Sequence, residues 1–297
     1  MYVVLRFNEE EIIKLFSSYF IIATVLSLLT IFLLPTDIGT MGKDYNYAWR
    51  GIYPVKNLFG RLMALGMSIY MILAMESRKY RMINLFLSLL CLMMVFFSKS
   101  IGGIVIALGL ITFIFIFPLL KIRSIIGFTL AITIVIIVFG IMIIGLEHFN
   151  FLMKNLGKDP TMTGRTIIWA LSWGMIQKEF IWGYGYNAFW VGWDGPSREI
   201  WKIAIWEPSH AHNGIFDLWL DLGLIGIIIF LLCYLQAFIR AYNYYNHNRF
   251  LSILPITILV YVFVANSIES FILKQNDFQW GLFVIISTLL SKKTKIE

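Results

Sequence analysis

The chain has 297 residues, of which 59% are hydrophobic and only 14% are charged, and its formal net charge is +7. An average soluble domain is about half apolar and about a quarter charged, so this composition argues against a soluble enzyme. The basic residues lie between long apolar runs. That pattern indicates membrane topology and contact with phospholipid headgroups, and not nucleic acid as a partner.

Apolar runs near the length that crosses a bilayer, roughly 20 residues, recur along the chain. They predict an all-α polytopic membrane protein with about eight transmembrane helices. We expect residues 1–297 to form a single transmembrane domain, with residues 147–213 as one large loop. The expected spans are residues 12–34, 58–75, 82–98, 101–120, 124–146, 214–239, 251–270 and 278–291.

Positive charge marks the short loops at residues 76–81 and 121–124, the arm at 240–249, and the C-terminal tail. Loops rich in Lys and Arg face the cytoplasm, which predicts that both termini are cytoplasmic. The large loop is then extracytoplasmic, together with two shorter segments. These shorter segments are residues 35–57 and 271–277.

Within the large loop, residues 165–180 predict an amphipathic helix with Trp169 and Trp173 on one face. Such a helix is typical of the membrane interface. The stretch that follows, "IWGYGYNAFWVGWDGP" at 181–196, is rich in Gly, Tyr and Trp. Aromatic side chains of this kind suit the headgroup layer, which is our interpretation for most of them, and they also suit sugar rings.

The motifs of common cofactor and metal sites are missing from the sequence. It contains no Walker loop, no dinucleotide-binding glycine run, no HExxH, no paired CxxC and no DxD-like pair. We therefore expect neither a cofactor nor a metal. Any bound phosphate would have to be held by Arg and Lys.

Basic residues on the predicted outer side are candidates for that role. Arg50, Lys56 and Arg61 stand around the start of the second span, and Arg165 stands at the start of the amphipathic helix. The N-terminus of a helix favours an anion, and an arginine there strengthens the attraction. We interpret all four as candidate diphosphate ligands. The alternative is that they only reach for lipid headgroups, which is most open for Lys56 and Arg61.

Two histidines, His210 and His212, stand just before the sixth predicted span. Histidine can take a proton near neutral pH, and His212 lies where water still reaches it, so we predict it as a general base, with His210 in support. Asn213, Asp217 and Asp221 follow at i, i+4 and i+8 and share a helix face. A carboxylate inside a span is costly and marks a candidate site. These side chains would orient the histidine or bind an acceptor sugar, or else pair with a basic residue of a neighbouring span.

The stretch "HNGIFDLWLDLGLIG" has His-Asn, nine residues, Gly, two residues and Gly. It resembles the signature of the bacterial O-antigen ligase and O-antigen polymerase superfamily. Three other stretches resemble segments of that superfamily in the same order, and the resemblance runs from about Arg6 to Leu232. They are "RGIYPVKNLFGR", "TGRTIIW" and "FIWGYGYNAF".

The resemblance implies a GT-C type, metal-independent, inverting glycosyltransferase of the bacterial cytoplasmic (inner) membrane. Such an enzyme transfers a glycan from a polyprenyl diphosphate to a hydroxyl of another glycan or of a lipid-linked core. By the same resemblance, Arg50 and Arg165 hold the diphosphate and His212 is the base. We favour a repeat-unit polymerase for exopolysaccharide, capsule or O-antigen, with chain-length regulator or flippase proteins as partners. The first alternative is a ligase that moves finished glycan to a lipid core or a protein.

Two features depart from the superfamily pattern. Val55 stands where a histidine is usual, and the chain looks short at its N-terminus, as a truncated homologue would. Two other functions stay open. A transporter or flippase of lipid-linked sugars would carry polar residues along several spans, but the first five spans are nearly bare of charge at their centres. A non-catalytic scaffold would leave the His-Asn motif and the outer arginines unexplained.

Overall fold

The computed structural model describes residues 4, 6–119, 163–204, 206–247 and 252–293. The predicted span 124–146 and the first part of the predicted loop, 147–162, lie outside the described residues. Every regular element in the described part is a helix, apart from an isolated bridge between Thr40 and Trp49. The longer helices are α2 (Glu9–Leu33), α4 (Lys56–Glu76), α5 (Arg81–Phe97), α6 (Ile101–Leu119), α8 (Thr163–Lys178), α10 (Gly214–His247), α11 (Ile253–Asn266) and α12 (Phe278–Lys293). Three short helices are α3 (Thr36–Gly39), the 3-10 turn η1 (Lys43–Tyr45) and α9 (Arg198–Trp201).

These helices confirm an all-α polytopic membrane protein. Four of them, α2, α4, α6 and α10, are long and apolar enough to cross a bilayer, and α5, α11 and α12 are shorter apolar helices. Each coincides with a predicted span, although α10 extends from the predicted end at 239 to His247. The total of about eight spans stays a prediction.

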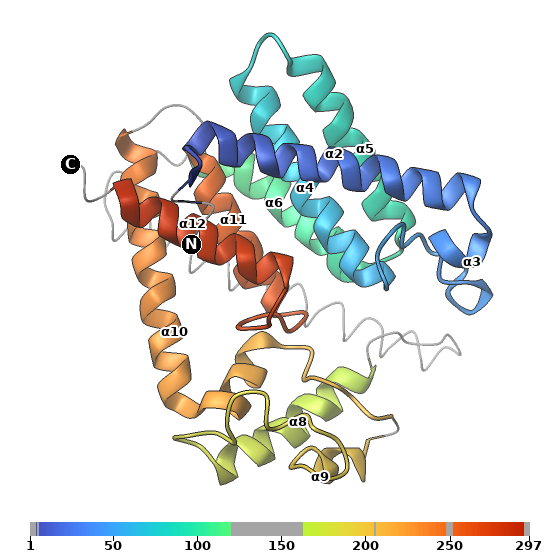
Figure 1. The fold of residues 1–297 in the computed structure, drawn as a ribbon, viewed down its shortest axis with the longest axis vertical. Coiled ribbons are helices and arrows are strands. Elements are labelled where there is room, and N and C mark those ends of the chain that lie inside the picture. The colour runs from blue at the N-terminus through green and yellow to red at the C-terminus, as the bar shows by residue number, and fades with distance from the viewer. Residues whose placement is uncertain (1–3, 5, 120–162, 205, 248–251, 294–297) are drawn as a thin grey trace. The chain divides into compact units, whose positions relative to one another are not determined.

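The described residues fall into two compact units. Unit 1 comprises residues 1–135, 237–261 and 282–297. Within it, α4 packs against α2, α5 and α6 (Figure 1). The backbones of α4 and α6 approach closely, because a Cβ on Gly103 would lie 2.9 Å from the carbonyl carbon of Gly60. Small residues at helix crossings are what membrane helices use to pack without a hydrophobic driving force.

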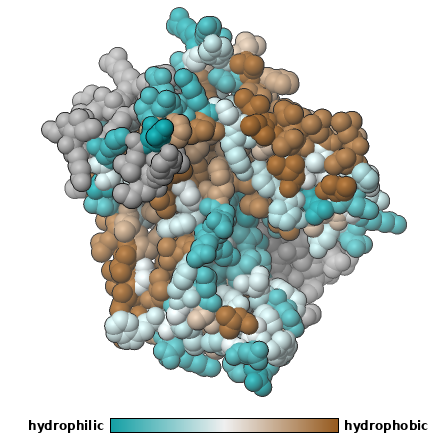
Figure 2. Space-filling view, in the orientation of Figure 1, coloured by the Kyte–Doolittle hydropathy of each residue, from teal (hydrophilic) through white to brown (hydrophobic). Residues whose placement is uncertain are grey.

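Apolar side chains cover much of the outside of the long helices. On α2, for example, Ile22 is 58% exposed, Phe32 67% and Leu33 73%. Figure 2 shows this apolar surface in brown over α2 and along α10. A contiguous apolar surface of this kind marks contact with lipid in a chain whose helices are long enough to span.

Unit 2 comprises residues 136–236 and 262–281. Its described part has a small core of its own around Met175, Ile176, Phe189, Ile200 and Leu220. Half-buried aromatic side chains pack on this core, among them those of the Gly-, Tyr- and Trp-rich stretch that follows α8. They are Tyr184, Trp190, Phe216 and Trp219. From that stretch, Tyr184, Phe189 and Trp190 are thus held by packing, whereas Trp182 and Trp193 are exposed.

Helix α10 is bent at Gly223, whose backbone is left-handed (φ 65°) and not helical. The segment after α8 supplies the hydrogen bonds that the bend releases: Tyr184 N–H donates to Leu220 O over 2.7 Å, and Leu224 N–H to Phe180 O over 2.9 Å. The crossing is too tight for a side chain, since a Cβ on Gly183 would lie 2.6 Å from Gly223 N, and one on Gly223 would overlap Ile181. Glycine is the residue that meets both demands.

Candidate functional site

The site of interest lies in unit 2, where residues 210–213 lead into α10. The backbone of Ala211 is held on both sides: its N–H donates to Asp217 Oδ1 over 2.9 Å, and its carbonyl accepts the indole N–H of Trp169 over 2.8 Å. The helix predicted at 165–180 is present as α8, and its Trp169 and Trp173 rings pack against aromatic rings of α10. The loop that carries the two histidines is therefore fixed by α8 and α10 together.

His212 has an unusual backbone. Its φ is 52°, in the left-handed region, where histidine is found more often than most side chains. Holding a non-glycine residue there costs about 1–3 kcal/mol, which the surrounding contacts must offset. The backbone N–H of His212 donates to His210 Nδ1 over 3.1 Å. The two imidazole rings lie edge to face, with their centres 4.1 Å apart. Strain of this kind is often found at functional sites.

Asn213 caps the helix that follows. Its side-chain oxygen accepts the N–H groups of Ile215 and Phe216 at 3.0 and 3.4 Å, which is what an N-cap residue does. Its own N–H donates to Ser270 Oγ over 3.0 Å. The side chain is therefore used by the fold, and its contribution to the site is to start α10 directly after His212.

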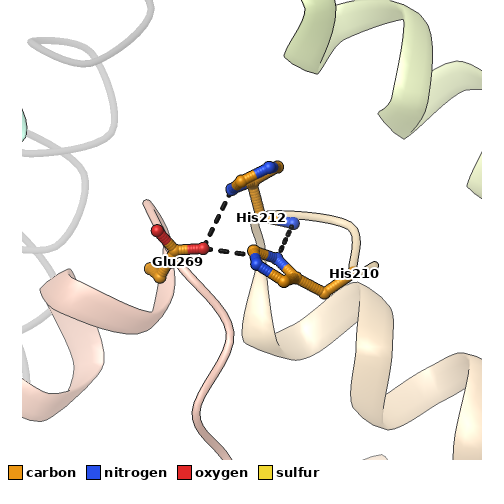
Figure 3. Close-up of side chains that lie close together, drawn as sticks. All are labelled: His210, His212 and Glu269. Atoms are coloured by element: carbon orange, nitrogen blue, oxygen red, sulfur yellow. Dashed lines mark hydrogen bonds and ion pairs between the residues drawn. The ribbon is translucent and has the colours of Figure 1, made fainter. Parts of the chain in front are cut away.

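Glu269 reaches the histidines from the turn after α11 (Figure 3). Its Oε1 is 2.9 Å from His212 Nδ1 and 3.2 Å from His210 Nδ1. A carboxylate accepts a hydrogen bond, so the contact with His212 favours a proton on Nδ1 and leaves Nε2 with its lone pair. The His212 side chain is 27% exposed, so solvent can reach it.

Sequence reasoning missed Glu269. It lies 57 residues after His212, beyond any periodicity or motif. The one signal in the sequence was a carboxylate inside the predicted span 251–270, one residue before its end, where a charged side chain marks a candidate site.

His210 stays neutral at physiological pH. Burial lowers its pKa to about 3, the attraction of Glu269 opposes this only in part, and His212, Lys274 and Arg165 lower it further. A neutral imidazole keeps a lone pair on one ring nitrogen, and the hydrogen bond from His212 N–H places that lone pair on Nδ1.

Asp217 and Asp221 share one face of α10, as predicted, but differ in their contacts. Asp217 Oδ1 accepts both the Ala211 N–H and the indole N–H of Trp190, the latter over 2.8 Å. Asp217 thus acts as an internal brace of the histidine loop. Both aspartates line a cavity of about 220 Å³ whose wall also includes His210 and Lys274.

Arg165 and Lys274 are the basic residues of this region. Arg165 is half-buried in the first turn of α8, and both residues are close enough to His210 to influence its charge state. Arg165 was expected from the sequence, whereas Lys274 was not. The structure therefore brings together Arg165, His210, His212, Asn213, Asp217 and Asp221 within unit 2.

Arg50 belongs to unit 1 and organises the turn before α4. Its Nε, Nη1 and Nη2 donate to the backbone carbonyls of Ile38, Pro54 and Asp37 at 3.2, 2.9 and 2.8 Å. A guanidinium has five N–H donors, so this arrangement orients it while leaving donors for a ligand.

The other two predicted anion ligands, Lys56 and Arg61, lie on α4 in unit 1. Lys56 Nζ is 3.4 Å from the carbonyl of Lys99 and 5.5 Å from the ring centre of Tyr45. Arg61 is only 4% exposed, so its side chain belongs to the interior of the unit. That position makes it a poorer anion ligand than the sequence suggested.

Comparison with known proteins gives matches over the region that holds the site. The family described as O-antigen ligase matches residues 85–231. The exopolysaccharide production protein ExoQ of Rhizobium meliloti is 29% identical over 92 residues, which is 30% of this chain and 21% of ExoQ. A putative polysaccharide ligase of Rickettsia felis is 27% identical over 164 residues, 52% of this chain and 37% of that protein. A putative polysaccharide ligase of Rickettsia conorii is 27% identical over 161 residues, which is 53% of this chain and 37% of that protein.

The aligned regions span about a fifth to just over a third of these curated relatives. The family match contains the His-Asn motif, Arg165 and the bend at Gly223, and ends before the turn that carries Glu269. These matches confirm the resemblance to the superfamily, and the family match contains three of the four sequence motifs but begins after the first, at residues 50–61.

Proposed function

Because the match over residues 85–231 makes this chain a member of the O-antigen ligase and polymerase superfamily, we propose that it is a metal-independent, inverting glycosyltransferase. A polysaccharide ligase or polymerase type of function follows from the family and its relatives. The finer proposal is transfer of a glycan from a polyprenyl diphosphate to an acceptor hydroxyl, at the outer face of the bacterial cytoplasmic membrane, with both termini in the cytoplasm.

The observation that carries the proposal is the contact between His212 and Glu269. With its Nδ1 proton held by Glu269 at 2.9 Å, His212 offers Nε2 to the acceptor hydroxyl. Nε2 takes the hydroxyl proton as the oxygen attacks the anomeric carbon. The bond from that carbon to the diphosphate oxygen breaks, the configuration at carbon inverts, and the diphosphate leaves with its negative charge. Glu269 steadies the imidazolium that forms.

In this proposal Arg165 of unit 2 stabilises the leaving diphosphate, and Arg50 of unit 1 is assigned to the diphosphate by the sequence resemblance. The support is that Arg165 lies in the first turn of α8, where its charge lowers the pKa of His210, and that the guanidinium of Arg50 is pre-oriented by three carbonyls. Lys56 adds positive charge near the start of α4. Arg61 is assigned to the same group on sequence grounds alone, and its burial makes it the weakest member.

The acceptor is proposed to enter the cavity that Asp217 and Asp221 line, beside His210. Asp217 is committed to the brace, so Asp221 is the stronger candidate to accept a hydrogen bond from a sugar hydroxyl. Trp190 lines the same cavity and offers an aromatic face of the kind that sugar rings stack on.

We favour a repeat-unit polymerase, and the match to an exopolysaccharide production protein supports this choice. The ligase is the second candidate, supported by the relatives named as putative polysaccharide ligases. Chain-length regulators and flippases are the proposed partners in either case.

The test is a transfer assay with purified protein in lipid, given a polyprenyl-diphosphate oligosaccharide from the same host, in the presence of a chelator. The His212→Ala variant is the comparison, and its folding is checked by gel filtration and thermal unfolding. A ladder of longer glycans indicates a polymerase, and single transfer that requires an added core acceptor indicates a ligase. In either case His212→Ala should lower the rate about 10²–10⁴-fold.

Two results would contradict the proposal. One is full activity in well-folded His212→Ala. The other is movement of the lipid-linked glycan across vesicles without any new glycosidic bond, which would make the chain a transporter.

A further inference from the structure

His210, His212 and Glu269 turn polar side-chain atoms toward one another just before α10. His210 Nδ1 accepts the His212 N–H at 3.1 Å, and it also lies 3.2 Å from Glu269 Oε1. The single lone pair of a neutral Nδ1 serves one partner at a time. A metal ion that binds His210 Nδ1 would therefore take the place of the His212 backbone N–H at that nitrogen.

Three potential ligand atoms converge at this point. One nitrogen of His210, one nitrogen of His212 and a carboxylate oxygen of Glu269 all lie within 4.8 Å of one another, and Figure 3 shows the three side chains turned toward a common point. Zinc binds nitrogen and oxygen at about 2.0–2.2 Å, which in a tetrahedron separates neighbouring ligand atoms by roughly 3.3 Å. The two separations from Glu269, 2.9 and 3.2 Å, are close to that value.

We propose that His210 Nδ1, His212 Nδ1 and Glu269 Oε1 bind one divalent transition-metal ion such as Zn²⁺, and that this ion switches off the catalytic base. Two imidazoles and one carboxylate with a fourth position left for water form a donor set that zinc uses in proteins. Mg²⁺ prefers six oxygen ligands and should not bind.

The loss of the base follows from the tautomer. In the active form Nδ1 of His212 carries the proton and Nε2 holds the lone pair. A metal on Nδ1 requires the lone pair there, so the Nδ1 proton leaves to solvent and Nε2 takes one from solvent. Nε2 can then no longer accept the acceptor's proton. This loss of activity rests on the function proposed above, whereas binding of the ion does not.

The binding experiment uses the full chain in lipid with its affinity tag removed. Co²⁺ is titrated in as a visible probe, its absorption is followed, and Zn²⁺ is then added as a competitor. We expect one ion per chain. His210→Ala and Glu269→Gln should each weaken binding by at least about tenfold, since even the outer partners of a metal site are worth that much.

A matched control is His247→Ala, which removes a histidine at the far end of α10 from the cluster. It should leave the affinity for Co²⁺ unchanged. Absence of binding, or equal binding by His210→Ala and the unaltered chain, would overturn the site.

The proposed inhibition by the metal is tested by measuring glycan transfer. Zn²⁺ should abolish transfer, a chelator should restore it, and Mg²⁺ should leave it unchanged. If zinc binds but transfer is undiminished, the proposed inhibition is refuted and the metal site is retained. Cobalt binding that depends on His210 and Glu269, in a protein that makes no glycan under any condition, would instead refute the proposed function and leave the metal site in place.

Discussion

The two units of this protein are stabilised in different ways. Unit 1 is built of apolar side chains, and several of its buried polar groups are hydroxyls satisfied within their own helix, as Ser68 Oγ is by Leu65 O at 2.7 Å. In unit 2, by contrast, hydrogen bonds from indole and backbone N–H groups to a carboxylate and a carbonyl hold the histidine loop against the bent helix α10. Unit 1 should therefore be sensitive to lost volume, and unit 2 to single lost polar or backbone contacts.

The largest expected effect comes from the core of unit 1. Phe59 is fully buried in α4, and Phe59→Ala should destabilise the protein by about 3–5 kcal/mol. The control is Phe86→Ala on α5, where the ring is 63% exposed and should cost far less. Thermal unfolding in the same lipid measures both. Equal losses from the two variants would show that packing does not dominate in unit 1.

The next effect concerns the bend in α10. Gly223→Ala places a side chain at a left-handed φ and against the backbone of Ile181, so we expect a loss of about 1–3 kcal/mol from the φ alone, with more from the overlap. Transfer activity should fall too, because the bend sets the first turns of α10.

Gly174→Ala is the matched change for the bend. This glycine lies inside α8, and a Cβ added to it would meet nothing within 4 Å, so alanine should stabilise the helix by about 0.5–1 kcal/mol. Unfolding curves of the two variants should shift in opposite directions. A neutral Gly223→Ala would mean that the tight crossing is not required.

The brace of the histidine loop comes third. Asp217→Ala leaves the indole N–H of Trp190 and the N–H of Ala211 without their acceptor, which should cost about 1–3 kcal/mol. Trp190→Phe keeps an aromatic ring but removes its donor. Because the two share one hydrogen bond, the double variant should lose less than the sum of the single losses, by about 0.5–3 kcal/mol. Strict additivity in thermal unfolding would exclude the brace.

The smallest effect concerns Arg50 in unit 1. Arg50→Lys keeps the charge but loses the planar fork that reaches three carbonyls, so the turn should loosen by about 1 kcal/mol. Hydrogen exchange of residues 37–54 would report it. Lys56→Ala, which removes a single contact of 3.4 Å to a carbonyl, should leave exchange there nearly unchanged. If both variants exchange alike, Arg50 does not organise this turn.

The sequence by itself determined the helical membrane architecture and the ends of most described helices, because the length and composition of an apolar run are local properties. It also determined the shared face of Asp217 and Asp221 and the superfamily, and it led to His212 as the proposed base, because these depend on spacing along one segment. Gly223 could be recognised from its spacing after the His-Asn motif, but the bend that it allows in α10 could not.

Only the tertiary structure decided which residues of distant segments are in contact. It placed Glu269 against His212, brought Gly183 against Gly223, gave Asp217 the role of a brace and buried Arg61. Each of these depends on contacts between segments far apart in the chain, or on which face of a helix is covered. Such contacts are set by the packing of whole elements, and no periodicity within one segment encodes them.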